Sequence, residues 1–130
     1  MITFSADITP VTFKRTLQNG RRRFNDPRYS EFKRQLATFA RLAMADHAPF
    51  EPLDCPVKLS VDIFNRAEPS SLKFGDADNH LKAVADALIG ICYTDDRLIV
   101  EASVRLFRGQ PHIIISFGAL PREAIHHENH

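Results

Sequence analysis

Residues 75–96 of this 130-residue chain read GDADNHLKAVADALIGICYTDD, with five aspartates and one lysine among them. The pattern predicts a helix over residues 77–89, because Asp76 suits the N-cap position and a glycine follows the apolar run. Asp95 and Asp96 come shortly after the predicted helix. Carboxylates gathered this closely repel one another unless a cation lies among them, and oxygen ligands favour Mg²⁺ or Mn²⁺ over Zn²⁺.

The polar face of the predicted helix allows two interpretations. A helical wheel places Asp78, Asn79, Lys82 and Asp86 within an arc about 100° wide, opposite an apolar face that we expect to pack on a sheet. One interpretation is an ordinary solvent face on which Lys82 pairs with Asp78 or Asp86. The other is a metal site, completed by the later Asp-Asp pair if the following strand starts beside the helix. We expect His80 to lie on the helix surface.

The remaining elements predict an α+β fold. Alternating apolar and polar residues predict strands at residues 2–8, 57–63, 98–106 and 112–117. A further helix is predicted from Ser30 to about Asp46, with Ser30 as its cap. The turn residues 108–111 indicate that the last two strands form an antiparallel hairpin. We therefore expect one domain over residues 1–130, with a mixed or antiparallel sheet of about four strands, two main helices and a flexible tail from about 121 to 130.

The net charge of +1 hides an uneven distribution. Residues 1–50 carry nine Lys and Arg against four Asp and Glu, whereas residues 51–96 carry four against nine. A basic segment at residues 10–28 before an acidic centre is typical of proteins that bind a polyanion around a metal site, although chance also produces such halves. The dipeptide Asn19-Gly20 is a tight-turn signal, so this segment forms either a basic hairpin or a loose loop.

Several other classes of protein are not indicated. Cys55 and Cys92 have no spacing typical of a zinc or redox site, and we expect both to be reduced, as in a cytoplasmic protein. No apolar run approaches the ~20 residues that a membrane span needs. The chain has no Gly-rich phosphate loop and no Ser-His-Asp pattern. His126, His127 and His130 indicate a polar tail more readily than a metal site.

The spacing of the acidic stretch resembles that of the RusA Holliday junction resolvases. The matching pattern is Asp76-x-Asp78-Asn79-x-x-Lys82-x-x-x-Asp86-Ala87-Leu88 followed by Asp95-Asp96. The resemblance continues as a strand pattern to about residue 118 and includes the strand near residues 57–64. It implies a homodimeric α+β endonuclease, found mainly in bacteria and phages, that cleaves four-way DNA junctions symmetrically with Mg²⁺ or Mn²⁺ in recombination and repair.

The resemblance also implies roles for individual residues. The catalytic residues would be Asp76, Asp78, Lys82 and Asp96. The metal ligands would be Asp76, Asp78, Asp95 and Asp96, with Asn79 and Asp86 as supporting groups. The residues expected to contact DNA are Lys14, Arg15, Arg21, Arg22, Arg23, Arg28 and Lys73. Phe107 and Phe117 are candidates either for the dimer interface or for the core.

One position departs from the family pattern. Some relatives have arginine directly before the first acid, whereas this chain has Gly75, preceded by Lys73 and Phe74. This difference bears on junction preference more than on the chemistry. Two alternatives stay open: a DNA-binding protein that does not cut, and a Mg²⁺-dependent nucleotide phosphohydrolase.

Overall fold

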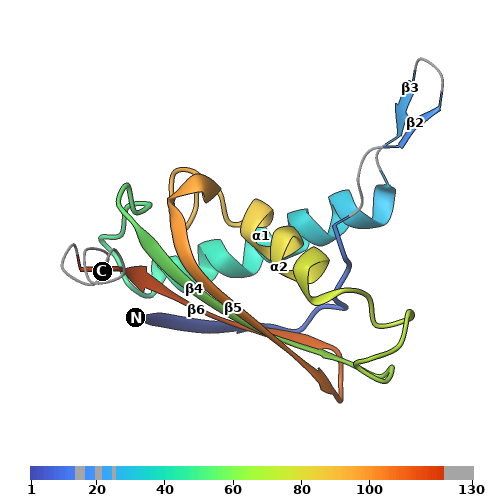
Figure 1. Cartoon of the computed structure of the whole chain (residues 1–130). Coiled ribbons are helices and arrows are strands. Elements are labelled where there is room, and N and C mark those ends of the chain that lie inside the picture. Colours follow the sequence, from blue (N-terminus) through green and yellow to red (C-terminus); the bar gives the residue numbers. More distant parts are fainter. Residues whose placement is uncertain (14–16, 20–21, 25, 122–130) are drawn as a thin grey trace, which may run out of the picture.

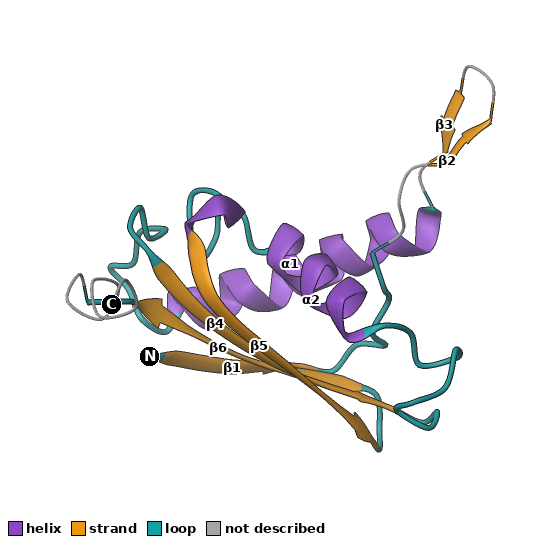
Figure 2. Ribbon diagram, viewed as in Figure 1, coloured by secondary structure: helices purple, strands orange, loops and turns teal. Residues whose placement is uncertain are grey.

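The computed structural model describes residues 1–13, 17–19, 22–24 and 26–121. Its main sheet contains β1 (Ile2–Ala6), β4 (Val57–Asn65), β5 (Ile99–Arg108) and β6 (His112–Ala119), in the order β1-β6-β4-β5. Helices α1 (Pro27–Ala45) and α2 (Ala77–Ala87) lie together on one face of this sheet (Figures 1 and 2). The α+β prediction is therefore confirmed, and the sheet is mixed, because β4 runs parallel to β5 and antiparallel to β6.

The core lies between the helices and the inner face of the sheet. Every second residue of β4 is buried, as the alternating sequence predicts: Val57, Leu59, Val61 and Ile63. Helix α1 buries one residue per turn in the same core: Phe32, Leu36, Ala40 and Met44. Each fully buried large aliphatic or aromatic side chain contributes about 1.5–3 kcal/mol. These two periodic faces therefore supply much of the free energy that holds α1 on the sheet.

Helix α1 begins earlier than the sequence indicated. Asp26, not Ser30, is the N-cap, and its carboxylate accepts a hydrogen bond of 2.9 Å from the backbone N–H of Arg28. Pro27 then takes the first helical position, where a missing N–H has no cost. The Asp-Pro dipeptide was the signal for this boundary.

The predicted hairpin between the last two strands is wrong. Strand β4 lies between β5 and β6, and β5 occupies the edge of the sheet. The backbone N–H of Gly109 donates to the carbonyl of Asn65 at 2.8 Å, so the turn after β5 passes across the end of β4. This order puts β6 and β4, which both bury alternate apolar residues, at the centre, whereas residues 100–103 of β5 are exposed, as suits an edge.

The basic segment contains a short hairpin rather than a loose loop. Strands β2 (Leu17–Asn19) and β3 (Arg22–Phe24) pair antiparallel, with Asn19 opposite Arg22. In Figure 1 both strands lie beyond the N-terminal end of α1, away from the main sheet. Of the two forms predicted for this segment, a hairpin and a loose loop, the structure has the hairpin that the Asn-Gly turn signal indicates.

The outer face of the sheet carries a stack of rings across three strands. Phe64 of β4 stacks on Phe107 of β5, with ring centroids 4.8 Å apart, and on His112 of β6 at 4.0 Å. Phe107 therefore lies half-buried on the outer face, whereas Phe117 is a fully buried core residue. In the described part of the chain, no helix has both the length and the hydropathy needed to cross a bilayer.

Candidate active site

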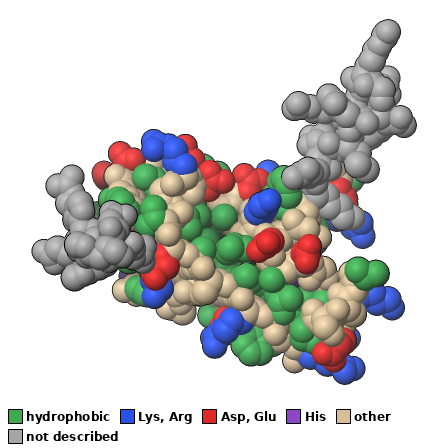
Figure 3. Space-filling view, in the orientation of Figure 1, with side chains coloured by type: hydrophobic (Ala, Val, Ile, Leu, Met, Phe, Trp, Pro, Cys, Tyr) green, Lys and Arg blue, Asp and Glu red, His purple; other side chains and the backbone are tan. Residues whose placement is uncertain are grey.

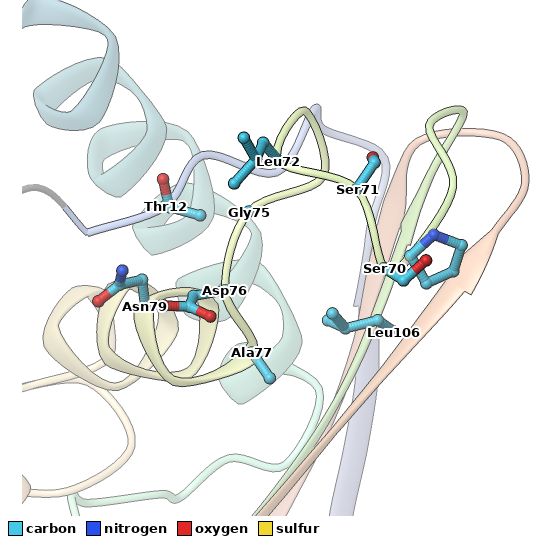
Figure 4. A pocket seen from close by; sticks show the side chains of 10 residues that line it. Thr12, Ser70, Ser71, Leu72, Gly75, Asp76, Ala77, Asn79 and Leu106 are labelled. Carbon is cyan, nitrogen blue, oxygen red and sulfur yellow. The ribbon is translucent and has the colours of Figure 1, made fainter.

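The first acids of the pattern lie at the N-terminal end of α2. Asp76 is the N-cap residue and has extended backbone angles, but its carboxylate makes no capping hydrogen bond. Figure 4 shows Asp76 and Asn79 close together at the first turn, beside a cavity. Asp78 is exposed in the same turn. Within the described residues, neither Asp76 nor Asp78 forms an ion pair, so both carboxylates face solvent at the positive end of a helix dipole.

His80 supports the loop that leads into this turn. Its side chain is only 2% exposed, and its Nε2 forms a 2.6 Å hydrogen bond with the carbonyl oxygen of Phe74. The buried ring of Phe74 meets it edge-on, with centroids 5.5 Å apart. Burial lowers the pKa of His80, an effect that the Phe74 carbonyl partly opposes. The neutral imidazole therefore anchors the backbone directly before Gly75 and Asp76.

The prediction that His80 is a surface residue is wrong. His80 is spaced three and four residues from other buried side chains of α2, namely Ala83, Val84 and Ala87. It therefore lies on the apolar face of the wheel, opposite Asp78. That spacing was visible in the sequence and was the signal for its burial.

Asp86 fastens α2 to α1. Its Oδ2 accepts hydrogen bonds from the Tyr29 hydroxyl at 2.9 Å and from the Lys33 ammonium at 3.0 Å. The Lys33 ammonium also lies 5.0 Å from the centre of the Tyr29 ring. Burial, and then the bond to Asp86, raise the pKa of Tyr29, so the phenol stays protonated as a donor. The sequence placed Asp86 among the supporting groups but missed Tyr29 and Lys33, whose i,i+4 spacing on α1 was the available signal.

Lys82 has no ion pair within the described residues. The side chain is exposed, and its ammonium lies 6.0 Å from the ring centroid of Phe13. The pairs with Asp78 and Asp86 that an ordinary solvent face would contain do not form, because Asp86 bonds to α1 instead. The charge of Lys82 is therefore available on the same face of α2 as Asp78.

Phe13 joins the basic segment to α2. Its backbone N–H donates to the carbonyl of Asn79 at 2.9 Å, and its ring meets Tyr29 edge-on at 5.5 Å. The chain that leads to β2 is thus fixed next to the first turn of the acidic helix.

Asp95 and Asp96 lie beyond the other end of α2, at the start of the 3₁₀ helix η1 (Asp96–Leu98). Asp95 accepts hydrogen bonds from the backbone N–H of Arg97 at 3.1 Å and from its guanidinium at 3.3 Å. The backbone bond is the main reason why the pKa of Asp95 is low. Partial burial raises the pKa of Asp96, and so do its contact with Asp95 and the negative charges of Asp95 and Asp86. The carboxylates of Asp95 and Asp96 therefore lie in contact with each other, and the charge of Asp86 also acts on Asp96.

The acids thus fall into two sets along α2. Eight residues separate Asp78 from Asp86, which corresponds to about 12 Å of helix at 1.5 Å per residue. Among the described residues, no three His, Cys, Asp or Glu side chains lie close enough together to hold a metal ion. The convergence of Asp76 and Asp78 with Asp95 and Asp96 on one ion therefore stays a prediction.

The chemistry of the donors nevertheless fits a hard divalent cation. Both sets present carboxylate oxygens, and Figure 3 shows acidic side chains close together on this face, next to a strip of hydrophobic ones. A cation would offset the negative charges of Asp95 and Asp86, which add to burial in raising the pKa of Asp96, and would neutralise the unpaired charges at the N-terminal end. Asp76 and Asp78 at one end and Asp95 and Asp96 at the other are thus suitable ligands for Mg²⁺ in type and charge.

The predicted DNA-binding residues are described only in part. Arg28 is exposed, and its guanidinium pairs with Asp26 at 3.3 Å. Lys73 is exposed in the loop before Phe74. The backbone of Arg22 and Arg23 lies in β3. Lys14, Arg15 and Arg21 lie outside the described residues.

Gly75 cannot be replaced without strain. Its φ is +90°, and a Cβ atom there would lie 2.5 Å from Cγ2 of Thr12. We expect Gly75→Ala to lower the free energy of unfolding by about 1–3 kcal/mol, because both the backbone conformation and the space exclude a side chain. Urea unfolding would measure this. The matched control is Gly109→Ala, where the new Cβ would meet Phe64 at an ordinary 3.6 Å. Equal losses in the two variants would contradict the prediction.

His80 should make stability depend on pH. Because its pKa is lowered from 6.5 in the folded protein, the unfolded chain binds a proton first as the pH falls. Its contribution is fully present above about pH 6.5 and is lost as the pH falls from there toward the folded pKa. We expect the decrease in Tm between pH 7.5 and pH 5.5, in metal-free buffer, to be smaller in His80→Gln than in the wild type. The exposed His47, changed to Gln, is the control and should leave the decrease unchanged.

Comparison with known proteins identifies the family to which the acidic pattern belongs. No curated protein sequence matches the chain. The family model described as Endodeoxyribonuclease RusA matches residues 7–117, which include β4, α2, the two acidic sets and β5. The match covers most of the chain and includes every acid and the lysine of the predicted site. The chain therefore belongs to the RusA family of endodeoxyribonucleases, which act on Holliday junctions.

Proposed function

We propose that this protein is a Mg²⁺-dependent endonuclease that resolves four-way DNA junctions by symmetric phosphodiester cleavage in recombination and repair. One observation carries the proposal: Asp78 and Lys82 lie on the same exposed face of α2, and neither has an ion pair within the described residues. Exposed charges of both signs, held on one helix face and not paired with each other, are open to ligands from solvent. They suit a site that receives a cation and a phosphate.

Each residue of the site has a distinct role in this proposal. Asp76, Asp78 and Asp96, with Asp95 next to Asp96, would hold Mg²⁺ (or Mn²⁺). A bound metal would supply polarisation of the scissile phosphate and a lowered pKa of the attacking water. Lys82 neutralises the negative charge that develops on the phosphate.

Two further residues keep this set in place. Asp86 fixes the direction of α2 through Tyr29 and Lys33. Asn79 holds the basic segment through its backbone carbonyl. Asp76 and Asp78 therefore lie at the start of a helix that is held by contacts on two sides, whereas Asp95 and Asp96 lie beyond its other end.

Basic residues would hold the DNA backbone. Arg22 and Arg23 lie on a hairpin beyond the end of α1, and Lys73 lies in the loop before the acids. Six phosphate contacts, made by Lys14, Arg15, Arg21, Arg22, Arg23 and Arg28, would give a log–log salt slope of about −5 on B-DNA. A homodimer suits the substrate, because a four-way junction has approximate two-fold symmetry and a C2 dimer presents two identical sites to it.

Cleavage should depend on Asp78 and Lys82. We expect Asp78→Asn and Lys82→Ala each to lower the rate of junction cleavage by about a hundredfold or more, because each removes a charge that acts in the transition state. Cleavage of labelled four-way junctions in Mg²⁺ and in Mn²⁺ would measure this. Tm and junction affinity should change little, since both side chains are exposed.

Two surface residues serve as controls. Asp46→Asn at the end of α1 and Lys58→Ala on β4 make the same changes of charge away from α2 and should cleave like the wild type. Full activity in Asp78→Asn or Lys82→Ala would remove that residue from the mechanism. Wild-type protein that binds junctions without cutting them would point to a DNA-binding protein. Cleavage of nucleotides alone would point to a phosphohydrolase.

The hairpin should account for part of the salt dependence of binding. We expect the triple change of Arg21, Arg22 and Arg23 to Gln to weaken junction binding and to make the log–log salt slope less steep by about 3. Fluorescence anisotropy across a series of salt concentrations would measure both quantities. A control with Arg34, Arg41 and Lys58 changed to Gln removes as much charge from α1 and β4. If the two triple variants behave alike, the hairpin is not the DNA contact.

A further inference from the structure

A cavity of about 440 Å³ opens directly beside Asp76. Its walls come from four parts of the chain: the loop at residues 69–75, the first turn of α2, Thr12 and Leu106 of β5 (Figure 4). These parts are fixed relative to one another, because His80 holds the loop and Phe13 holds the segment next to Thr12. The cavity is thus a built feature of the fold, and its volume lies in the range of small-molecule sites.

The lining combines apolar surfaces with polar groups that have no protein partner. Pro69, Leu72 and Leu106 supply the apolar part, and Leu72 is fully exposed. The Ser71 hydroxyl donates a hydrogen bond to the backbone carbonyl of Glu68 at 2.6 Å. Within the described residues, the side chains of Ser70 and Asn79 make no hydrogen bond. An amide and a hydroxyl beside apolar walls suit a flat heterocycle that bears donors and acceptors along its edge.

We propose that this cavity holds one unpaired nucleobase of the strand whose phosphate lies at Asp76. The inference rests on the proposed nuclease function, since it needs a DNA strand at the acids. A base inside a stacked duplex cannot enter, and extracting one costs a few kcal/mol. That cost is least where bases are already unpaired or unstacked, as at the branch point of a junction. The cavity would therefore add selectivity for branched DNA to the electrostatic binding of the DNA backbone by the arginines.

The two walls have separate tasks in this arrangement. Leu72 and Leu106 would contact the face of the base, the Ser70 hydroxyl beside Leu106 would meet its edge, and Asn79 lies next to Asp76 at the first turn of α2. Because the base enters from the side of Asp76, its own backbone phosphate is held next to the carboxylates. Occupation of the cavity thus positions the strand for cleavage.

The test combines a DNA change with a protein change. Junctions would carry one abasic site, moved through the nucleotides within two positions of the cleavage point, and binding would be measured by anisotropy in EDTA. For the wild type, we expect one position at which removal of the base weakens binding about tenfold, because the burial of the base against the apolar walls is lost. In Leu106→Trp, which fills the cavity, the intact and abasic junctions should bind equally.

Two further variants make the result decisive. Leu42→Trp introduces the same side chain at an exposed position of α1 and should keep the wild-type dependence on the base. Leu72→Ala removes a fully exposed wall without touching the core, and should reduce the tenfold effect even if Leu106→Trp fails to fold. The proposal is overturned if no abasic position weakens wild-type binding, or if Leu72→Ala and a folded Leu106→Trp both keep the full effect. If the wild type neither binds nor cuts intact junctions, it is the nuclease function that fails.

Discussion

The parallel pairing of β4 with β5 is the constraint on which the rest of the structure depends. Two parallel neighbours cannot be joined by a tight turn, so the chain between them must return along the whole sheet. Residues 66–98 make this return, and they contain the loop at the cavity, α2 and η1. Every acid of the candidate site lies in this one connection. The site is therefore placed by backbone hydrogen bonds of the sheet, at some distance from the acids themselves.

The two ends of α2 differ in how their charge is balanced. At the C-terminal end, Lys33 and Arg97 offset Asp86 and Asp95, while burial first, and then the neighbouring Asp95 and Asp86, raise the pKa of Asp96. At the N-terminal end, Asp76 and Asp78 have only the helix dipole within the described residues. The stabilised end thus fixes the helix, whereas the unbalanced end is where a ligand has most to contribute.

Local patterns predicted local features well. The alternation of β4, the apolar stripe of α1 and the cap of α2 all follow from the period of side chains along a single element. The order of the strands does not, because the insertion of β4 between β5 and β6 depends on partners far apart in sequence. The partners of Asp86 were missed for the same reason, since Tyr29 lies 57 residues away. The burial of His80 could have been predicted from the sequence, because its spacing to Val84 and Ala87 places it on the apolar face of α2. The placing of the two acidic sets depends on how α2 and η1 pack, which no local spacing determines.

The link between Phe13 and Asn79 has a consequence for how the family can vary. It joins a main-chain N–H to a main-chain carbonyl, so no side chain is part of it. Nineteen of the twenty amino acids can occupy position 13 without losing this bond, since only proline lacks the donor. The segment leading to the hairpin can therefore diversify in sequence while its attachment to α2 is preserved.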